Sequence, residues 1–444
     1  IALLSATSVC VMLSIGIYRC RWAVLEEAII DNIRASASAI VILLLIGAIA
    51  GTWMVSGVVP TMIYYGLQIL HPSFFLVASC AICAVVSLMT GSSWTTIATI
   101  GVALMGIGQA MGFSEGWVAG AIISGAYFGD KLSLLSDTTV LASSTAGVEV
   151  FTHIRYMLYT TVPSMLIALG VFTVAGLALD HGVSTHAEMY AATLAATFRI
   201  TPWLLAVPLA TGMLIARKLP AIVTLFCAAV FACIAMLLAQ PELVAKVAGV
   251  GGLDFMSGFK GVLMSCFGPT AIPTGSPQLD ELVATRGMAG MLNTVWLIIC
   301  AMCFGGVMTG SGMLGALTSV FLRFVRRAFS AVASTVGAGI FFNLCTADQY
   351  ISIILSGRLF RELYAERGLE PRLLSRSVED SATVCSVLVP WNSCGMTQAT
   401  VLGVSTFVYM PYCIFNIVSP LMSLMVAAIG WKIKRAAGTA AHPH

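Results

Sequence analysis

Two short polar runs that contain acidic residues interrupt long apolar stretches of this chain. The first, Gly129 to Thr139, holds Asp130 and Asp137. The second, in the other half of the chain, extends from Glu379 to Ser393. An ionised carboxylate near the centre of a bilayer costs roughly 2.5–3.5 kcal/mol on insertion scales, so acids at that depth mark ion or proton paths. These residues therefore indicate transport chemistry.

Oxygen-bearing side chains in these runs and in one nearby turn suit a hard monovalent cation. Sodium and lithium prefer carboxylate, hydroxyl, amide and carbonyl oxygens. The candidate donors are Asp137, Thr138, Thr139, Thr346, Asp348, Asn392 and Ser393. Because burial raises the pKa of a carboxylate, such a group can hold a proton until a cation displaces it. Competition for one carboxylate is sufficient for exchange of cation against proton.

The composition places these runs in a membrane protein. Of the 444 residues, 59% are hydrophobic and 9% are charged, and the mean hydropathy is +0.97. Soluble domains have about a quarter charged residues. The net charge of +3 is too small to indicate nucleic-acid binding. We expect a multi-pass protein of the plasma membrane, namely a bacterial inner membrane. It should contact lipid and have no nucleic-acid partner.

The start of the chain and the cysteines give two further expectations. The apolar run from Ile1 has no basic leader, so it does not resemble a cleavable signal, and a start without methionine suggests that an upstream helix is absent. The CxxC pairs Cys80/Cys83 and Cys300/Cys303 lie in apolar runs, whereas the histidines lie in loops or in the tail. We interpret them as small buried hydrophobes rather than as metal or redox sites.

The basic clusters order the membrane spans. The clusters are Arg19 to Arg34, His153 to Arg155, Arg217-Lys218, Arg323 to Arg327, Arg358 to Arg376 and Lys432 to Arg435. Assigning all of them to the cytoplasm gives spans of about 20 apolar residues. We place them near 1–18, 37–59, 156–179, 200–216, 219–239, 289–312 and 411–430. The segment 258–288, broken by several prolines, is left as an interfacial insertion.

Two further stretches leave from and return to the same side. Residues 73–112 turn at Thr90 to Thr96, and residues 328–357 turn at Asn343 to Asp348, from opposite sides of the membrane. Each re-entrant hairpin precedes a segment with a polar break, at 129–139 and at 389–395. Turn and break are about 46 residues apart in the first half, from Gly91 to Asp137, and about 48 in the second. This is typical of an inverted repeat.

The predicted fold is thus an all-helical membrane protein with two inverted repeats, each with a re-entrant hairpin and a broken helix. Repeat one spans 1–180, a linker with a connecting span 181–218, repeat two 219–435, and a tail 436–444. Irregular backbone is tolerated at membrane depth only where protein or a water-filled cavity surrounds it. We expect hairpin tips and breaks to converge on one site.

Each candidate also has a purely structural interpretation. Asp130 and Lys131 can neutralise each other, Asp348 can cap a helix, and Glu379 and Asp380 can be charges at the cytoplasmic rim. The hairpin-tip hydroxyls, which can either contact an ion or satisfy loose backbone, are Ser92, Ser93, Thr95 and Thr96. Trp94 and Trp391 are better explained as packing or interface anchors than as substrate platforms.

At this point the residues carry a resemblance to the NhaC-type sodium/proton antiporter family. It rests on Gly129 to Thr139, Ala142-Ser143, Phe151 to Arg155, Thr346 to Tyr350, Glu379 to Ser381 and Pro390 to Gly395. The resemblance implies the ion-transporter superfamily, with a scaffold, a hairpin-bearing transport domain and often a homodimer that works by an elevator-like movement. It supports Asp130, Asp137, Asp348 and Asp380 as motif positions, and Asn392 as a break residue. Leu134 departs from the pattern, which usually has proline there.

The resemblance leaves the solute open. Relatives in the family include exchangers of small organic acids such as malate and lactate, and an organic anion would require a fixed cation. Lys131 is the only basic residue in either break, so its pairing decides between the two hypotheses. A passive cation channel also remains open, because rings of acids line such pores.

An enzyme is disfavoured. No Tyr-Asp dipeptide accompanies the aspartates, as an intramembrane aspartyl protease would require, and there is no HExxH helix, phosphate loop or nucleophile elbow. The sequence therefore predicts a cofactor-free exchanger of sodium or lithium for protons. Asp137 would be the shared carboxylate, Asp348 and Asp380 second carboxylates, and Asp137, Asp348 and Asn392 the sodium ligands.

Overall fold

Helices form every regular element in the part of the chain that the computed structural model describes. The described residues are 2–178, 185–217, 219–252, 254–275, 279–280, 283–323, 325 and 327–433. An isolated β-bridge pairs Thr270 with Thr285. The expected tail 436–444 and the expected boundaries at 180, 218 and 435 lie outside the described residues.

The first half of the chain contains the following elements. They are α1 (Ala2–Gly16), α2 (Trp22–Val55), α3 (Val58–Ile69), α4 (Pro72–Thr90), α5 (Ser93–Thr96), π-helix η1 (Ile97–Gly101), α6 (Val102–Ala110), α7 (Glu115–Leu132), α8 (Asp137–Ala146), α9 (Val150–Ala178), α10 (Thr185–Thr197), 3-10 helix η2 (Pro202–Leu205) and α11 (Ala206–Ala216).

The second half continues with a similar set. Its elements are α12 (Ala221–Ala239), α13 (Pro241–Ala248), α14 (Phe255–Phe267), α16 (Gly287–Gly310), α17 (Met313–Arg323), α18 (Ala328–Thr346), α19 (Gln349–Glu366), α20 (Pro371–Val378), π-helix η3 (Glu379–Thr383), 3-10 helix η4 (Ser386–Leu388), α21 (Ser393–Leu402), α22 (Thr406–Tyr409), 3-10 helix η5 (Met410–Tyr412) and α23 (Ile414–Ile429).

Six of the described helices are long and apolar enough to cross a membrane, and two bent helix pairs raise the number to eight if each pair is one span. The six are α2, α4, α9, α12, α16 and α18. The chain is therefore an all-helical, polytopic membrane protein. Helix length does not decide whether 73–112 and 328–357 are re-entrant, because α4 and α18, with 19 residues each, are long enough to cross a membrane.

Two span predictions need correction. Residues 37–55 of the expected span 37–59 belong to a 34-residue helix, α2, and its last two residues begin α3. α2 begins already at Trp22 because the charged residues of 26–34 continue the helix rather than forming a loop. The expected span 1–18 is a 15-residue helix, α1, shorter than a membrane-crossing helix needs. Within the expected insertion 258–288, α14 supplies a short apolar helix, and α16 begins at its end.

The two halves share one pattern of boundaries. Helices α18, α19 and α21 begin 256 residues after α4, α5 and α8, and α20 begins 256 residues after α7. Left-handed backbone recurs at the same spacing, at Gly91 and Ala347, Gly112 and Gly368, and Gly147 and Gly403. Turns and breaks therefore occupy matching positions, although the residue types at those positions differ.

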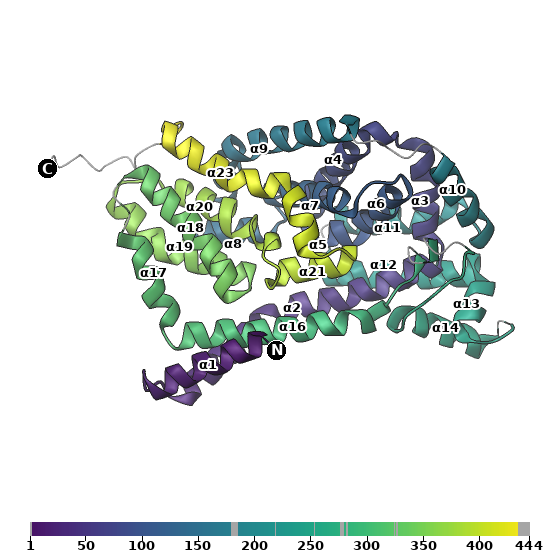
Figure 1. Ribbon diagram of the computed structural model, residues 1–444, viewed down its shortest axis with the longest axis horizontal. Coiled ribbons are helices and arrows are strands. Elements are labelled where there is room, and N and C mark those ends of the chain that lie inside the picture. Colours follow the sequence, from purple (N-terminus) through teal and green to yellow (C-terminus); the bar gives the residue numbers. More distant parts are fainter. Residues whose placement is uncertain are drawn as a thin grey trace.

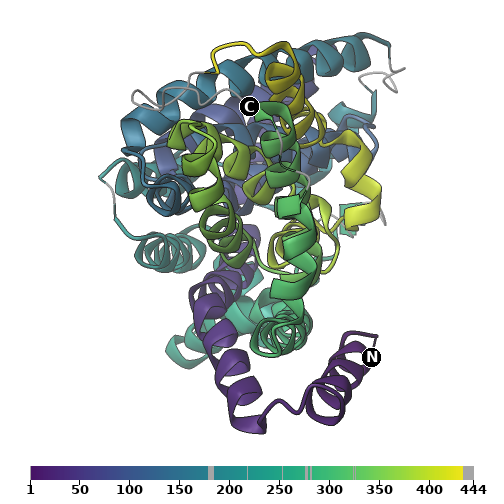
Figure 2. The same ribbon diagram turned by 90° about the vertical axis from the view of Figure 1, so that its left-hand side faces the viewer.

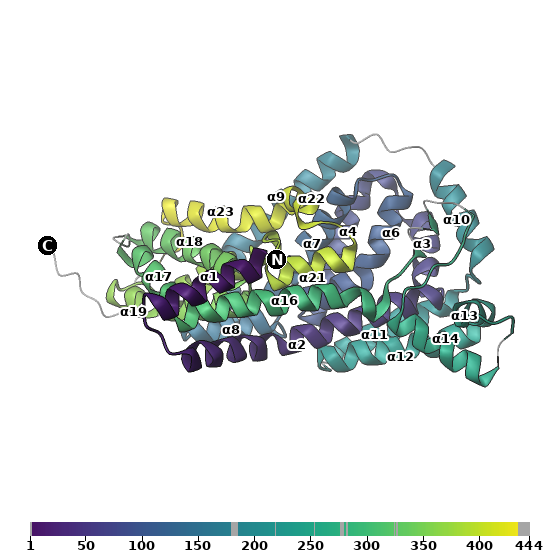
Figure 3. The ribbon, with the colours of Figure 1, turned by 60° about the horizontal axis from the view of Figure 1, so that its bottom comes forward.

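The long helices α2, α16 and α12 lie together along one side of the molecule, and α9 and α23 lie along the opposite side (Figure 1). The hairpin arms and broken helices, α5 to α8 and α18 to α21, fill the space between them. α1 lies beside α16 and projects at the bottom of Figure 2, whereas Figure 3 shows it lying across α16. The polar runs are thus enclosed between two helical walls.

Close packing of α4 on α7 positions the first break. A Cβ atom at Gly129 would lie 2.2 Å from the Ala84 carbonyl oxygen, so a larger residue would push the helices apart. Cys80 and Cys83 of α4 are buried in the same apolar core, as free thiols. This contact holds the end of α7, with Asp130 and Lys131, next to the tip after α4.

Candidate functional site

The two hairpin tips have the same local architecture. At each tip a residue in left-handed conformation, Gly91 or Ala347, ends one helix, and the next residue caps the following helix. The capping side chains are Ser92, which accepts from the Thr95 amide at 3.2 Å, and Asp348, which accepts from the Ile351 amide at 3.0 Å. Local backbone chemistry thus accounts for part of what Ser92 and Asp348 do.

A threonine before each tip closes it in the same way. The Thr90 hydroxyl contacts Ser92 and the Thr96 hydroxyl, the latter at 3.2 Å. The Thr346 hydroxyl makes the equivalent contacts with Asp348 and with the Ser352 hydroxyl, also at 3.2 Å. Thr346, a candidate ligand, is therefore engaged in holding the second tip.

Asp130 lies against the first tip. Its carboxylate accepts hydrogen bonds from the Ser93 hydroxyl at 2.7 Å and from the Ser93 amide at 3.2 Å, and the residue is buried. The second half has a related contact at the matching positions, where the Ser386 hydroxyl donates to the Gln349 side-chain oxygen at 2.8 Å. Of the two matching residues, Asp130 and Ser386, only Asp130 carries a charge.

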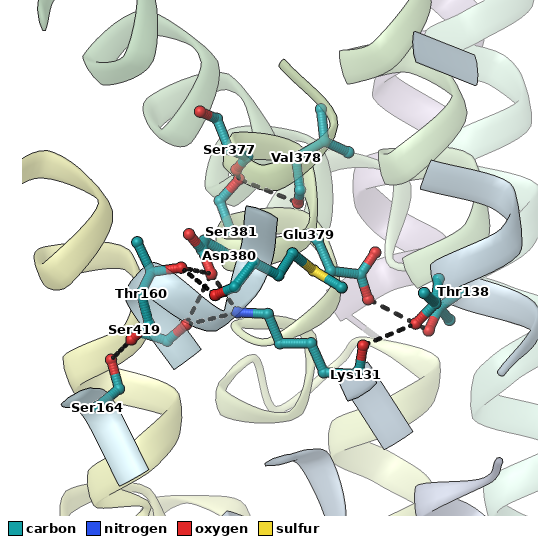
Figure 4. Close-up of polar contacts among 12 residues, drawn as sticks. Lys131, Thr138, Thr160, Ser164, Ser377, Val378, Glu379, Asp380, Ser381 and Ser419 are labelled. Carbon is teal, nitrogen blue, oxygen red and sulfur yellow. Dashed lines mark hydrogen bonds and ion pairs between the residues drawn. The ribbon is translucent and has the colours of Figure 1, made fainter. Parts of the chain in front are cut away.

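Lys131 pairs with Asp380 and not with Asp130. The two side chains form an ion pair across the two halves, and neither is exposed (Figure 4). The same Asp380 oxygen accepts from the Ser419 hydroxyl at 3.1 Å and the Thr160 hydroxyl at 3.3 Å, while its other oxygen has no hydrogen-bond partner. The expected neutralisation of Asp130 by Lys131 is wrong because the Lys131 stem reaches past its own helix to η3.

Glu379 is the second acid on η3. It is fully buried and its carboxylate lies 3.5 Å from the Thr138 hydroxyl, while its other oxygen has no partner (Figure 4). Both η3 acids are therefore interior, and their interpretation as charges at the cytoplasmic rim is wrong. π-helical turns inside α-helices often mark functional sites.

Asp137 differs from the other acids in its exposure. It is the first residue of α8, whose cap is the Ser136 side chain, and the Asp137 carboxylate has no hydrogen-bond partner in the described part of the chain. Its side chain is exposed, yet it lies near enough to Asp130 for the two charges to interact. Asp137 is thus the accessible acid beside a buried one.

Asp348 is held at the second tip by hydroxyls from two other elements. The Ser393 hydroxyl donates to it at 3.2 Å and the Ser36 hydroxyl of α2 at 3.4 Å. The residue is buried and has no basic partner among the described residues. A carboxylate ringed by hydroxyls and without a fixed counter-charge can hold a proton or a small cation.

The remaining predicted ligands shape the breaks. The Asn392 side chain caps α21 by accepting from the Cys394 amide at 3.0 Å and donates to the Asn343 side chain at 3.1 Å. The Thr139 hydroxyl donates to the Lys131 carbonyl at 3.1 Å, and the Thr138 hydroxyl pairs with Ser136 at 2.9 Å. Each of these side chains lies at a break, and each already forms hydrogen bonds within the protein.

Sequence reasoning missed two residues of this region. Tyr350, after the second tip, lies in the neighbourhood of Asp130, Asp137 and Asp348. Arg376 is fully buried on α20, and its guanidinium stacks on the Tyr156 ring at 4.7 Å with no hydrogen-bond partner for any nitrogen. The positive-inside rule assigned Arg376 to a cytoplasmic loop because it counts charges and does not detect a helix that folds back into the bundle.

The buried charges leave an excess of acid. Among the described residues, the buried charged side chains are four acids, Asp130, Asp348, Glu379 and Asp380, and two bases, Lys131 and Arg376. Two acids are therefore without a fixed cation, and Asp137 adds a third near the surface of the site. Burial of uncompensated carboxylates is costly, so protons or cations must neutralise them.

Comparison with known proteins gives the chain a family. Residues 125–431 match the Na+/H+ antiporter family. The Na+/H+ antiporter NhaC of Alkalihalophilus pseudofirmus is 34% identical over 412 residues, covering 93% of this chain and 86% of the relative. The malate-2H+/Na+-lactate antiporter of Bacillus subtilis is 36% identical over 409 residues, covering 91% and 84%.

Two further comparisons concern an amino-acid antiporter and a solved transporter structure. The arginine/ornithine antiporter ArcD of Halobacterium salinarum is 33% identical over 416 residues, covering 93% of this chain and 83% of the relative. The crystal structure of the YdaH transporter of Alcanivorax borkumensis aligns with a TM-score of 0.40 at 14% identity, covering 92% of this chain and 89% of that chain. That structural likeness is too distant to carry an argument.

The relatives transport different solutes, so similarity alone gives the class of protein and not the solute. With the match over 125–431, and with relatives above 30% identity across nine-tenths of the chain, the class is defined. The chain belongs to the Na+/H+ antiporter family of multi-pass membrane transporters, which are not enzymes.

Proposed function

We propose that this protein exchanges sodium or lithium for protons across a bacterial plasma membrane. The observation that carries the proposal is the pairing of Lys131 with Asp380, which removes the only basic residue of the breaks from the reach of an organic anion. Asp130, Asp137 and Asp348 are then free to take cations or protons. Hard oxygen ligands and an excess of negative charge favour a small monovalent cation.

Asp137 is the proposed shared carboxylate. It is exposed, while Asp130 beside it is buried and hydrogen-bonded to Ser93, so an ion can reach Asp137 first. Asp348, with the Ser393 hydroxyl and the second lone pair of the Asn392 amide oxygen, is the proposed partner on the second tip. Asp380 serves mainly to hold Lys131, and Glu379 is an additional proton carrier.

Alternating access is proposed to arise from an inverted repeat. The 256-residue spacing of helices and left-handed residues supports a duplication. Basic clusters flank the second hairpin, at Arg323 to Arg327 and Arg358 to Arg376, and none flanks the first, which supports opposite orientation. The spacing matches 72–146 to 328–402, so we place the conserved cores of the copies there, inside the expected repeats 1–180 and 219–435. An elevator-like movement in a homodimer is proposed from the family resemblance.

Organic-acid exchange is the second candidate, and one specific observation favours it. The Arg376 guanidinium is buried with all its nitrogens unpartnered, and such a group prefers a bidentate carboxylate. Arg376 lies one helical turn before Glu379, whose free oxygen is an alternative partner within the chain. Organic-acid exchange requires an external carboxylate there, and cation exchange does not.

Proton flux into proteoliposomes with a trapped pH dye separates these functions. Sodium, lithium, potassium, malate, lactate, arginine and ornithine are added singly to the wild type. We expect sodium or lithium alone to drive proton movement, and Arg376→Lys to retain it. Proton movement that requires malate or lactate, and that is lost in Arg376→Lys, would transfer the protein to the organic-acid exchangers.

A further inference from the structure

One face of α8 has no packing partner among the described residues, although the matching face of α21 is packed. Asp137, Val140 and Ser144 share this face because they are three and four residues apart on a helix. All three are exposed, Val140 by 42%. α8 packs through its other side on α9, α19 and α20.

The equivalent residues of α21, 256 positions later, are enclosed. Ser393 is 2% exposed. Met396 is 6% exposed and lies in an apolar cluster with Met291 and Ala347. Thr400 pairs with Thr294 of α16 through their hydroxyls at 2.7 Å. α21 is therefore docked on the helix pair α2 and α16.

The matching docking surface for α8 exists on α2. The residue 256 positions before Thr294 is Ser38, and the residue 256 positions before Thr400 is Ser144, so a second hydroxyl pair is available. Both serines are exposed. Ala35, which corresponds to Met291, is also exposed and small, which permits close helix approach.

We propose that the unpartnered face of α8 docks on α2 in a second conformation, with Ser144 against Ser38, while α21 leaves α16 and the Thr294–Thr400 pair opens. Docking encloses Asp137 as Ser393 is enclosed here. Because two related packings of one duplicated element differ little in energy, both states are accessible to one chain. This inference rests on the proposed alternating access.

The direction of opening follows from the basic clusters. α8 leads into the cluster at His153 to Arg155, which the positive-inside rule assigns to the cytoplasm. The present structure, with α8 undocked and Asp137 exposed, is then open to the cytoplasm. The second state exposes Ser393 and Asp348 to the opposite side.

Cysteine cross-linking in lipid vesicles tests the docking surface. In a chain with its native cysteines replaced, Ser38→Cys/Ser144→Cys is compared with Thr294→Cys/Thr400→Cys and with the control Ala37→Cys/Ser144→Cys, in which the α2 residue points about 100° away. A disulfide requires Cα atoms roughly 4.4–6.8 Å apart. Linked peptides are quantified by mass spectrometry.

We expect the Ser38/Ser144 pair to cross-link at least fivefold more than the control, and the two engineered disulfides never to occur in one chain of a four-cysteine variant. A thiol probe at Val140→Cys should react at least tenfold more slowly once Ser38 and Ser144 are linked. Cross-linking no better than the control, both disulfides in one chain, or an unchanged rate at Val140→Cys would overturn the proposal. None of these measurements depends on the transported solute. A failure of sodium-driven flux would therefore not change the outcome of the docking test.

Discussion

The Lys131–Asp380 pair predicts a large coupling between two residues that are far apart in sequence. Both side chains are fully buried, so removing one leaves the other charge in a medium of low polarity. Breaking a buried pair in this way costs about 3–5 kcal/mol, whereas replacing both partners with apolar residues is often neutral. We therefore expect Lys131→Met and Asp380→Leu each to destabilise the protein by about 3–5 kcal/mol, and the double variant to recover most of that loss.

The assay is reversible denaturant unfolding of the purified protein in mixed micelles, followed by tryptophan fluorescence. The predicted interaction energy from the double-mutant cycle is roughly 3 kcal/mol or more. The exposed Arg34–Asp31 pair, with side chains 76% and 61% exposed, is the matched control, and its removal should change stability by less than about 1 kcal/mol. Additive losses at Lys131 and Asp380, with the double variant as unstable as the sum, would refute the buried pairing.

Two other perturbations follow from the tips and breaks. Gly91→Ala should destabilise the protein by at least about 1–2 kcal/mol, because Gly91 has φ +66° and the added Cβ would lie 2.6 Å from Leu135. Ala347→Gly at the matching position, where φ is +57°, should be neutral or stabilising. Equal losses in melting temperature at both positions would contradict this reasoning. Asn392→Ser keeps a neutral oxygen that can cap the Cys394 amide but loses the amide donor to Asn343. It should therefore be less damaging than Asn392→Ala, which loses both contacts and should cost about 2 kcal/mol. The reverse order in the same unfolding assay would exclude the capping role.

Local features of the site could be predicted from the sequence because they depend on backbone chemistry. Small and polar residues at Thr90 to Ser92 and at Thr346 to Asp348 disfavour helix, and the chain turns at both places as expected, although Ser93–Thr96 of the expected first turn already forms α5. Polar breaks at Ser133 to Ser136 and at Val389 to Asn392 likewise interrupt helices. Each of these segments encodes its own capping residue.

Contacts between the halves could not be predicted in the same way. Lys131 and Asp380 are 249 positions apart, and Asp130 was the nearer acid along the chain. The reach of Lys131 depends on how α7 packs against η3, which no local pattern records. The exposure of Asp137 has the same origin, because it reflects which wall α8 packs against.

Arg376 illustrates a different limit. As part of a basic cluster it was assigned to the cytoplasm, yet it is fully buried on Tyr156. One available signal was the 256-residue relation, since Arg376 corresponds to Gly120 in the middle of α7. An alignment of the two halves position by position would have predicted that Arg376 lies inside the helix bundle.

Proton release on sodium binding tests most directly whether one carboxylate serves both ions. Isothermal titration of the purified protein with sodium chloride, in two buffers that differ in protonation enthalpy, gives the number of protons released per sodium bound. We predict at least one proton released by the wild type, and none by Asp137→Asn, with Asp137→Glu retaining release. Sodium binding without proton release, or unchanged release in Asp137→Asn, would contradict exchange at Asp137.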